Sequence, residues 1–203
     1  YIREKSAVVS HSYDQTLYPA VRKKHDGPIT FRYIGSFYGR RTPEPLFRAL
    51  DYLAKSNPEL LKRMRIELVG AESTEFSRIR LERFAEGLPD GVVRLASQET
   101  YLDSLKTMSA ADVLLVIDAD YEKNVFLPSK LIDYLGAGRP IIGITMPGPS
   151  SRLLDEMGAC WVRPEETAGI AQMLSEACNL VDREREQGVI AADYAAVKAR
   201  FSA

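Results

Sequence analysis

The hydrophobic positions of the chain change period repeatedly, from the two-residue alternation of strands to the wider spacing of helices. Residues 29–34 alternate like a strand that stops at Gly35, and residues 43–56 carry leucines and a phenylalanine at helical spacing. The unit then repeats, because residues 64–69 form a second strand that stops at Gly70 and a further helix follows. This regular alternation of strand and helix favours an α/β fold.

The rest of the pattern completes a sheet of about six strands. The fourth strand is expected at residues 113–117, which are all apolar, as in a central parallel strand covered by helices on both faces. The other elements are expected as strands at 92–95, 140–144 and 160–162, and as helices at 100–108, 128–137, 150–157, 167–180 and 182–200. The pattern predicts a doubly wound, Rossmann-like parallel sheet in the order 3-2-1-4-5-6 with right-handed crossovers.

The two ends of the chain lack the regular pattern of its middle. Residues 1–28 have no clean period and end in a turn-forming glycine and proline, so we expect a lead-in or interdomain segment there. One Rossmann-like domain is expected at residues 29–180 and a C-terminal helix at 181–203. The chain opens on Tyr1 with neither a tag nor a targeting sequence, so we expect it to be cut from something longer.

Composition and charge exclude several classes of protein. Among 203 residues, 27 Lys and Arg stand against 28 Asp and Glu, so the net charge of −1 gives no reason to expect nucleic-acid binding. The longest wholly apolar run, residues 113–117, is far shorter than the roughly 20 residues that span a bilayer, and no signal peptide opens the chain, so we expect a cytoplasmic protein. Cys160 and Cys178 are expected to be unpaired, and His11 and His25 are too few for a zinc cluster.

The predicted topology restricts the search for a site to a few loops. In a doubly wound sheet the ligand binds beyond the carboxyl ends of the strands, here between strands 1 and 4. The loop after strand 1 holds Gly35, Gly39, Arg40 and Arg41, in which glycine backbone can approach a phosphate and a guanidinium can contact its oxygens. The spacing fits neither the dinucleotide motif nor the P-loop, which argues against a nicotinamide cofactor or ATP hydrolysis. An exposed loop with solvated arginines is the alternative.

The second candidate segment begins the helix after strand 4. Pro128 starts this helix, so Ser129 and Lys130 lie in its first turn, where a lysine is unfavourable against the helix dipole unless an anion is bound. Asp133 follows three residues later, where its carboxylate could accept hydrogen bonds from the hydroxyls of a ribose. A solvated Lys130–Asp133 pair is the alternative. The side chains of Arg41 and Lys130 are expected to be exposed when no ligand is bound.

A family resemblance rests on this helix. The run PSKLIDYLGAGRPII at positions 128–142 strongly resembles the nucleotide-sugar-binding segment of retaining glycosyltransferases of the GT-B fold, the group 1 or family-four class. Gly35, the basic loop, Leu68, Gly70 and Pro164 stand where these enzymes carry matching elements, and the resemblance runs from about residue 29 to 180. It implies one half of a GT-B fold, namely the C-terminal domain that binds the nucleotide sugar.

The resemblance also implies roles for individual residues. Arg41 matches the family's diphosphate-binding lysine and Asp133 the second of two glutamates, which binds ribose. The first glutamate is missing, since Val125 stands eight positions before Asp133, although Asp120 and Glu122 are near. With two cations in place no metal or other cofactor is expected, and the Asp118–Asp120 pair is expected to be structural or solvent-facing. The implied catalytic residues are Arg41 and Lys130, and the implied substrate-binding residues are Gly35, Ser36, Gly39, Arg40, Gly70, Pro128, Ser129, Leu131 and Asp133.

The function implied is transfer of a sugar from a nucleoside diphosphate sugar to an acceptor, in glycan or polysaccharide biosynthesis. The expected partners are that donor, an N-terminal domain of the same enzyme, without which this chain is expected to be inactive, and an acceptor at a membrane surface. One alternative is a nucleotide-sugar epimerase, which needs acids or histidines near the sugar, whereas His11 and His25 precede the sheet. Another is a non-catalytic nucleotide-binding module, although a receiver domain would carry paired acids where Arg40 and Arg41 stand.

Overall fold

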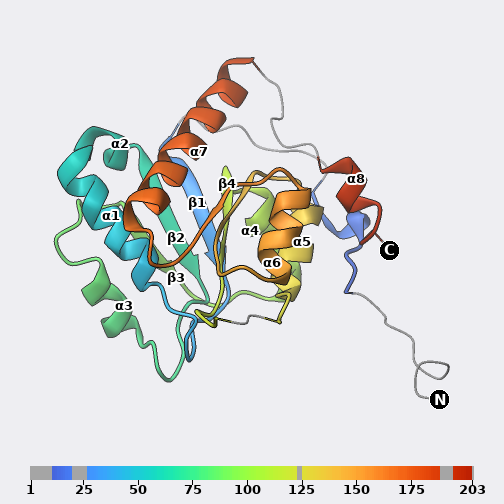
Figure 1. Ribbon diagram of the computed structural model, residues 1–203, viewed down its shortest axis with the longest axis horizontal. Coiled ribbons are helices and arrows are strands. Elements are labelled where there is room, and N and C mark those ends of the chain that lie inside the picture. The colour runs from blue at the N-terminus through green and yellow to red at the C-terminus, as the bar shows by residue number, and fades with distance from the viewer. Residues whose placement is uncertain (1–10, 20–26, 123–124, 188–193, 203) are drawn as a thin grey trace.

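Six parallel strands form one twisted sheet with helices on both faces (Figure 1). The computed structural model describes residues 11–19, 27–122, 125–187 and 194–202. The strand order is β3-β2-β1-β4-β5-β6 and every neighbouring pair is parallel, which confirms the predicted topology. The strands are β1 (Ile29–Ile34), β2 (Met64–Val69), β3 (Val93–Ala96), β4 (Val113–Ile117), β5 (Ile141–Ile144) and β6 (Trp161–Val162).

The helices follow the predicted order with two differences. A short helix, α2, comes directly after α1, because Asn57 caps it by accepting a hydrogen bond from the backbone N–H of Leu60. The predicted break near residue 181 is wrong, since α7 continues to Gln187 with Val181 buried on the same face as Cys178. The helices are α1 (Glu44–Ser56), α2 (Pro58–Lys62), α3 (Arg78–Phe84), α4 (Tyr101–Ser109), α5 (Ser129–Ala137), α6 (Pro149–Glu156), α7 (Thr167–Gln187) and α8 (Ala195–Lys198).

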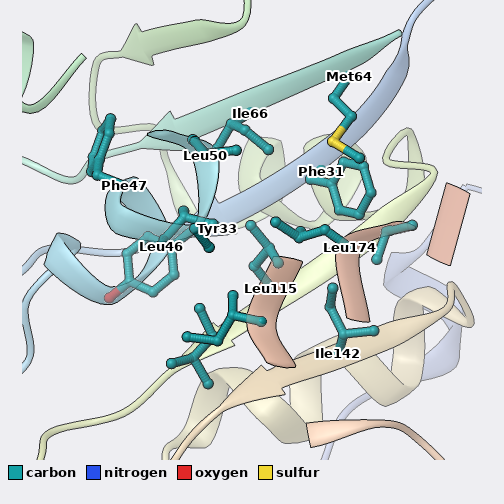
Figure 2. Packing of buried hydrophobic residues seen from close by; sticks show 14 of the residues in the cluster. Phe31, Tyr33, Leu46, Phe47, Leu50, Met64, Ile66, Leu115, Ile142 and Leu174 are labelled. Carbon is teal, nitrogen blue, oxygen red and sulfur yellow. The ribbon is translucent and has the colours of Figure 1, made fainter. Parts of the chain in front are cut away.

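A hydrophobic core lies on each face of the sheet. Figure 2 shows the first, in which Phe31 and Tyr33 of β1 pack with Leu46 of α1 and Leu174 of α7. The second core joins α4, α5 and α6 to the opposite face. Strand β4 supplies both, since Val113, Leu115 and Ile117 belong to the first core, and Leu114 and Val116 belong to the second. This two-sided burial explains why β4 is apolar throughout.

The two ends of the described chain lie side by side on the second face (Figure 1). The backbone N–H of Tyr13 donates a 2.9 Å hydrogen bond to the carbonyl of Phe201, and Tyr13 and Tyr18 are both buried in the second core. Tyr18 follows a 3-10 helix at Gln15–Leu17. Part of the predicted lead-in therefore packs on the domain, while residues 1–10 and 20–26, His25 among them, lie outside the described residues, as do residues 188–193 of the predicted C-terminal helix.

None of the helices in the described ranges is both long and apolar enough to cross a membrane.

Candidate functional site

The candidate site lies at the carboxyl ends of β1 and β4, where the strand order reverses. Gly35 follows β1 directly and Asp118 follows β4 directly. The loop between β1 and α1 brings Arg41 to this edge, and the first turn of α5 brings Lys130. Because parallel strands end at the same edge of the sheet, two loops about ninety positions apart in the sequence meet there.

Lys130 is held against the end of β1. Its Nζ lies 4.1 Å from the centre of the Tyr33 ring, a cation–π contact. It also lies so close to Gly35 that a Cβ at that position would stand 2.7 Å from Nζ. Gly35 has φ +123°, a conformation that glycine adopts most readily, so the turn favours glycine here, whereas a Cβ would be accommodated by displacing the end of the lysine side chain.

Within the described ranges, the charge of Lys130 has no counter-ion beside it. Among the described residues no carboxylate lies within 4.0 Å of its ammonium, and the alternative of a solvated pair with Asp133 is wrong. Burial, together with the charge of Arg41, lowers the pKa of Lys130 from the ordinary 10.5 to about 7, and the charge of Asp118 opposes this shift. A bound anion would supply the counter-ion that the described residues do not provide.

Arg41 is mostly buried rather than exposed. Only 13% of its side chain is accessible; one Nη donates to the Tyr38 hydroxyl at 3.0 Å, and the other lies 3.9 Å from a carboxylate oxygen of Asp118. Its Nε is buried with no acceptor among the described residues. The expectation of an exposed side chain is therefore wrong for Arg41, and for Lys130, which is half-buried. The ring of Tyr33 packs against Lys130 and the ring of Tyr38 against Arg41, and neither contact was predicted from the sequence.

Asp118 organises the floor of the site. Its side chain is 2% exposed, and one carboxylate oxygen accepts a 2.9 Å hydrogen bond from the Thr145 hydroxyl at the end of β5. Asp120, two residues later, is exposed, and its carbonyl accepts a hydrogen bond from Arg40. The buried Asp118 holds the ends of β4 and β5 together and faces Arg41, which agrees with the structural role expected for it.

Two cavities open around these residues. The larger, of about 420 Å³, lies between the β1–α1 loop and the start of α5, and the smaller, of about 350 Å³, lies between the same loop and the turn before α7. Gly39, Arg40 and Asp118 line both. Exposed apolar side chains form part of the rim of the larger cavity, which is lined by Tyr38, Arg41, Phe126, Leu127, Ser129 and Lys130, among others. Val125, where the family carries an acid, is 73% exposed beside them.

Asp133 lies about one turn after Lys130 on α5, and its carboxylate contacts other partners. Its carboxylate accepts a 3.1 Å hydrogen bond from the Tyr101 hydroxyl, and Nε2 of His11 lies 3.7 Å from the same oxygen. Burial raises the pKa of Asp133, while the hydrogen bond from Tyr101 and the proximity of His11 oppose that shift. His11 was not predicted as a site residue because it precedes the sheet in the sequence. Hydrophobic periodicity contains no information that would place it beside α5.

The remaining predicted site residues differ in their surroundings. Pro128 and Ser129 line the larger cavity, and the carbonyl of Ser36 accepts a hydrogen bond from the Tyr33 hydroxyl. Gly70 ends β2 beside Gln98, and it lines neither of the two cavities. The side chain of Leu131 is fully buried in the second core, so it supports the helix and does not face a ligand.

Within the described part of the chain, no group of three His, Cys, Asp or Glu side chains is placed to hold a metal ion.

Comparison with known proteins shows likeness in fold and not in sequence. No protein-family model and no curated protein matches this chain. Among solved structures, TarM is 13% identical over 87% of this chain and 31% of its own, with a TM-score of 0.63. The GtfA/B complex is 17% identical over 95% of this chain and 36% of its own, with a TM-score of 0.61. A trehalose-6-phosphate structure from E. coli, bound with UDP-2-fluoro glucose, is 15% identical over 79% of this chain and 39% of its own, with a TM-score of 0.61.

The chain spans about a third of the length of these solved structures. At such low identity the likeness concerns the fold alone. It covers most of the chain and agrees with the six-stranded parallel topology. The chain therefore has the fold of a Rossmann-like domain of GT-B glycosyltransferases, the fold that its sequence resemblance implied.

Proposed function

We propose that this chain is the donor-binding domain of a glycosyltransferase and binds a nucleoside diphosphate sugar. One observation carries the proposal: the Lys130 ammonium lacks a nearby carboxylate, and the Arg41 Nε lacks an acceptor, among the described residues at the strand ends. A lysine with no carboxylate beside it and a guanidinium whose Nε has no acceptor among the described residues, next to an open cavity of about 420 Å³, suit a diphosphate. The fold supports the proposal because nucleotide ligands bind at this edge of doubly wound sheets.

In the proposed reaction the two cations act on the leaving group. Breaking the bond between the sugar carbon and the phosphate oxygen leaves negative charge on the diphosphate. Arg41 and Lys130 stabilise that charge from fixed positions, so they contribute more in the transition state than in the ground state. The binding of a diphosphate also restores the charged form of Lys130, because a nearby anion raises the pKa of a lysine.

The other proposed contacts surround the two cations. Gly35, Ser36, Gly39 and Arg40 form the loop around the diphosphate, and Ser129 adds backbone and hydroxyl groups at the start of α5. Asp133 accepts hydrogen bonds from the ribose, and the Tyr101 hydroxyl already orients its carboxylate. Pro128 fixes the start of α5 and Leu131 anchors its first turn in the core, whereas Gly70 shapes the more distant edge near Gln98.

Sugar transfer is proposed for a larger enzyme of which this chain is one domain. The matched solved structures are about three times as long, and one of them is bound with UDP-2-fluoro glucose. We therefore propose that a further domain completes the site and supplies the acceptor surface. The chain alone binds donor without turnover. Membership of group 1 and a cytoplasmic role in glycan synthesis belong to the same proposal.

Calorimetric titration tests the proposal on the chain itself. The ligands are UDP, other nucleoside diphosphates, their sugars and inorganic pyrophosphate. We expect a nucleoside diphosphate to bind more tightly than pyrophosphate. Asp133→Asn keeps the shape of the side chain and is expected to weaken nucleotide binding while leaving pyrophosphate binding unchanged. If no nucleoside diphosphate binds, the proposal is wrong; if Asp133→Asn affects both ligands equally, the ribose contact is wrong.

A further inference from the structure

The side chain of Glu75 accepts a hydrogen bond from a backbone N–H in the glycine-containing loop between β1 and α1. Its carboxylate oxygen accepts a 2.6 Å hydrogen bond from the amide of Gly39, 36 positions earlier in the sequence. Gly39 lines both cavities and has φ +54°. Glu75 is exposed and belongs to the loop between β2 and α3. A carboxylate from outside the loop thus fills a donor position that the glycine offers to an anion.

The two loops are joined by other contacts that do not depend on this carboxylate. The N–H of Phe37 donates a 3.1 Å hydrogen bond to the carbonyl of Ala71. The rings of Phe37 and Phe76 lie 6.0 Å apart, and both residues are at least 98% buried. Because Phe76 directly follows Glu75, these contacts fix the loop backbone next to it. The exposed Glu75 side chain can leave Gly39 without separating the loops.

Carboxylate and phosphate oxygens compete for the same kind of donor. Both are anionic acceptors that form short, charge-assisted hydrogen bonds with backbone N–H groups. The loop also carries Arg40 and Arg41, which attract either anion. A phosphate that uses the Gly39 amide must displace Glu75, and afterwards the two negative groups repel each other. Since Glu75 is exposed, its carboxylate is hydrated readily once it leaves.

We propose that Glu75 is an internal competitor for the diphosphate: it occupies the Gly39 amide in the free chain, gives it up when the donor binds, and takes it back as the nucleoside diphosphate leaves. This inference rests on the proposed function. As a consequence, Glu75 lowers the affinity of the site for the nucleoside diphosphate. The product therefore dissociates faster than it would from the same site without the carboxylate. Release of product limits turnover in many enzymes, which makes such a residue a control on rate.

Substitution at Glu75 tests the proposal, with a matched control in the same loop. Glu72 is also exposed, but its carboxylate pairs with Arg78 at 2.6 Å instead of with Gly39. Binding of UDP and of inorganic pyrophosphate is measured by calorimetry, and dissociation by stopped flow, for the whole chain. We expect Glu75→Ala to bind both ligands about fivefold more tightly, mostly through slower dissociation. Glu75→Gln is expected to fall between Glu75→Ala and the parent, and Glu72→Gln within about twofold of the parent.

The outcomes separate this proposal from the one it rests on. Equal tightening in Glu75→Ala and Glu72→Gln means that only overall charge matters, which overturns the competitor. Weaker binding in Glu75→Ala means that the carboxylate organises the loop, which also overturns it. If pyrophosphate binds but no nucleotide does, the proposed function fails, and tighter pyrophosphate binding in Glu75→Ala still supports the competitor. If neither ligand binds any of the proteins, both proposals are wrong.

Discussion

The ammonium of Lys130 lies 4.1 Å from the centre of the Tyr33 ring, joining the first turn of α5 to strand β1. The ring partly compensates for the loss of water around the ammonium, since cation–π contacts contribute about 0.5–2 kcal/mol. It does not replace a counter-ion, so the pKa of the lysine stays low in the free chain. The same lysine thus connects the packing of the two central loops with the proposed binding of a diphosphate.

Removing either cation is expected to weaken nucleotide binding. Lys130→Ala and Arg41→Ala should each weaken the binding of a nucleoside diphosphate by about 1.5–3 kcal/mol, the scale of a hydrogen bond to a charged group. Arg41→Lys should retain most of the affinity because it retains the charge. Lys106→Ala is the control, since that lysine is exposed and pairs with Asp103. Calorimetry measures the affinities. Parent-like binding in both folded alanine variants would show that these cations do not hold the ligand.

Binding is expected to take up a proton above neutral pH. The pKa of Lys130 is about 7 in the free chain, and a bound diphosphate raises it towards 10.5. Between these values the free lysine is largely neutral and the bound one charged, so affinity should fall as pH rises above 7. Calorimetry at pH 8 in buffers of different ionisation enthalpy measures the proton directly, at a pH where the phosphate is itself ionised. Lys130→Arg should abolish the uptake; uptake that persists in this variant would assign the proton to another group.

The same pKa makes Lys130 unfavourable for the stability of the free chain. The unfolded lysine binds a proton throughout the interval from 7 to 10.5, and the folded one mostly does not, so the free energy of unfolding should rise with pH there. Lys130→Met removes this dependence and should stabilise the chain at pH 6 by on the order of 1 kcal/mol. Urea denaturation at pH 6 and pH 9 measures both effects, with Lys106→Met as the exposed control. A constant difference between parent and variant at the two pH values would contradict the prediction.

Gly35→Ala should cost both stability and binding. The positive φ at Gly35 strains any other residue by about 1–3 kcal/mol, and the new Cβ would meet Nζ of Lys130 at 2.7 Å. Gly91→Ala provides the control, because Gly91 has φ +81° but no atom within 4 Å of the corresponding Cβ. Both variants should lower the melting temperature, and only Gly35→Ala should weaken pyrophosphate binding. Equal effects of both variants on binding would mean that displacement of Lys130 has no part in it.

Gly136→Ala should detach the N-terminal segment from α5. A Cβ at Gly136 would collide with the ring of Tyr18, whose hydroxyl donates a 2.9 Å hydrogen bond to the carbonyl of Asp133. We expect a loss of about 1–3 kcal/mol in the free energy of unfolding, the usual cost of overpacking. Truncation by Tyr18→Ala removes the collision, so the double variant should be more stable than the sum of the single effects predicts. Additive effects in urea denaturation would show that the ring and the glycine do not interact in solution.

Local signals along the chain were sufficient to predict the elements and their order in the sheet. Strand alternation at residues 29–34, the apolar run at 113–117 and the helical spacing between them are local signals, and right-handed crossovers leave few ways to order six parallel strands. The prediction from local signals was wrong at the end of α7, where tertiary contacts extend the helix. Helix α7 continues past residue 181 because Val181 packs in the core beneath it, and Arg185 pairs with Asp112 at 3.2 Å.

The sequence also placed Arg41 and Lys130 at one edge, since both follow strands that end there. The surroundings of each charge depend on how the elements pack, which places Tyr33 beside Lys130, and Asp118 and Tyr38 beside Arg41. The same packing also brings Glu75 to Gly39 and His11 to Asp133. Hydrophobic periodicity reports which face of an element is buried, whereas these contacts join loops through side chains whose positions depend on how the elements pack. Burial and pairing, and with them the pKa of Lys130 and the availability of the Gly39 amide, are therefore properties of the fold.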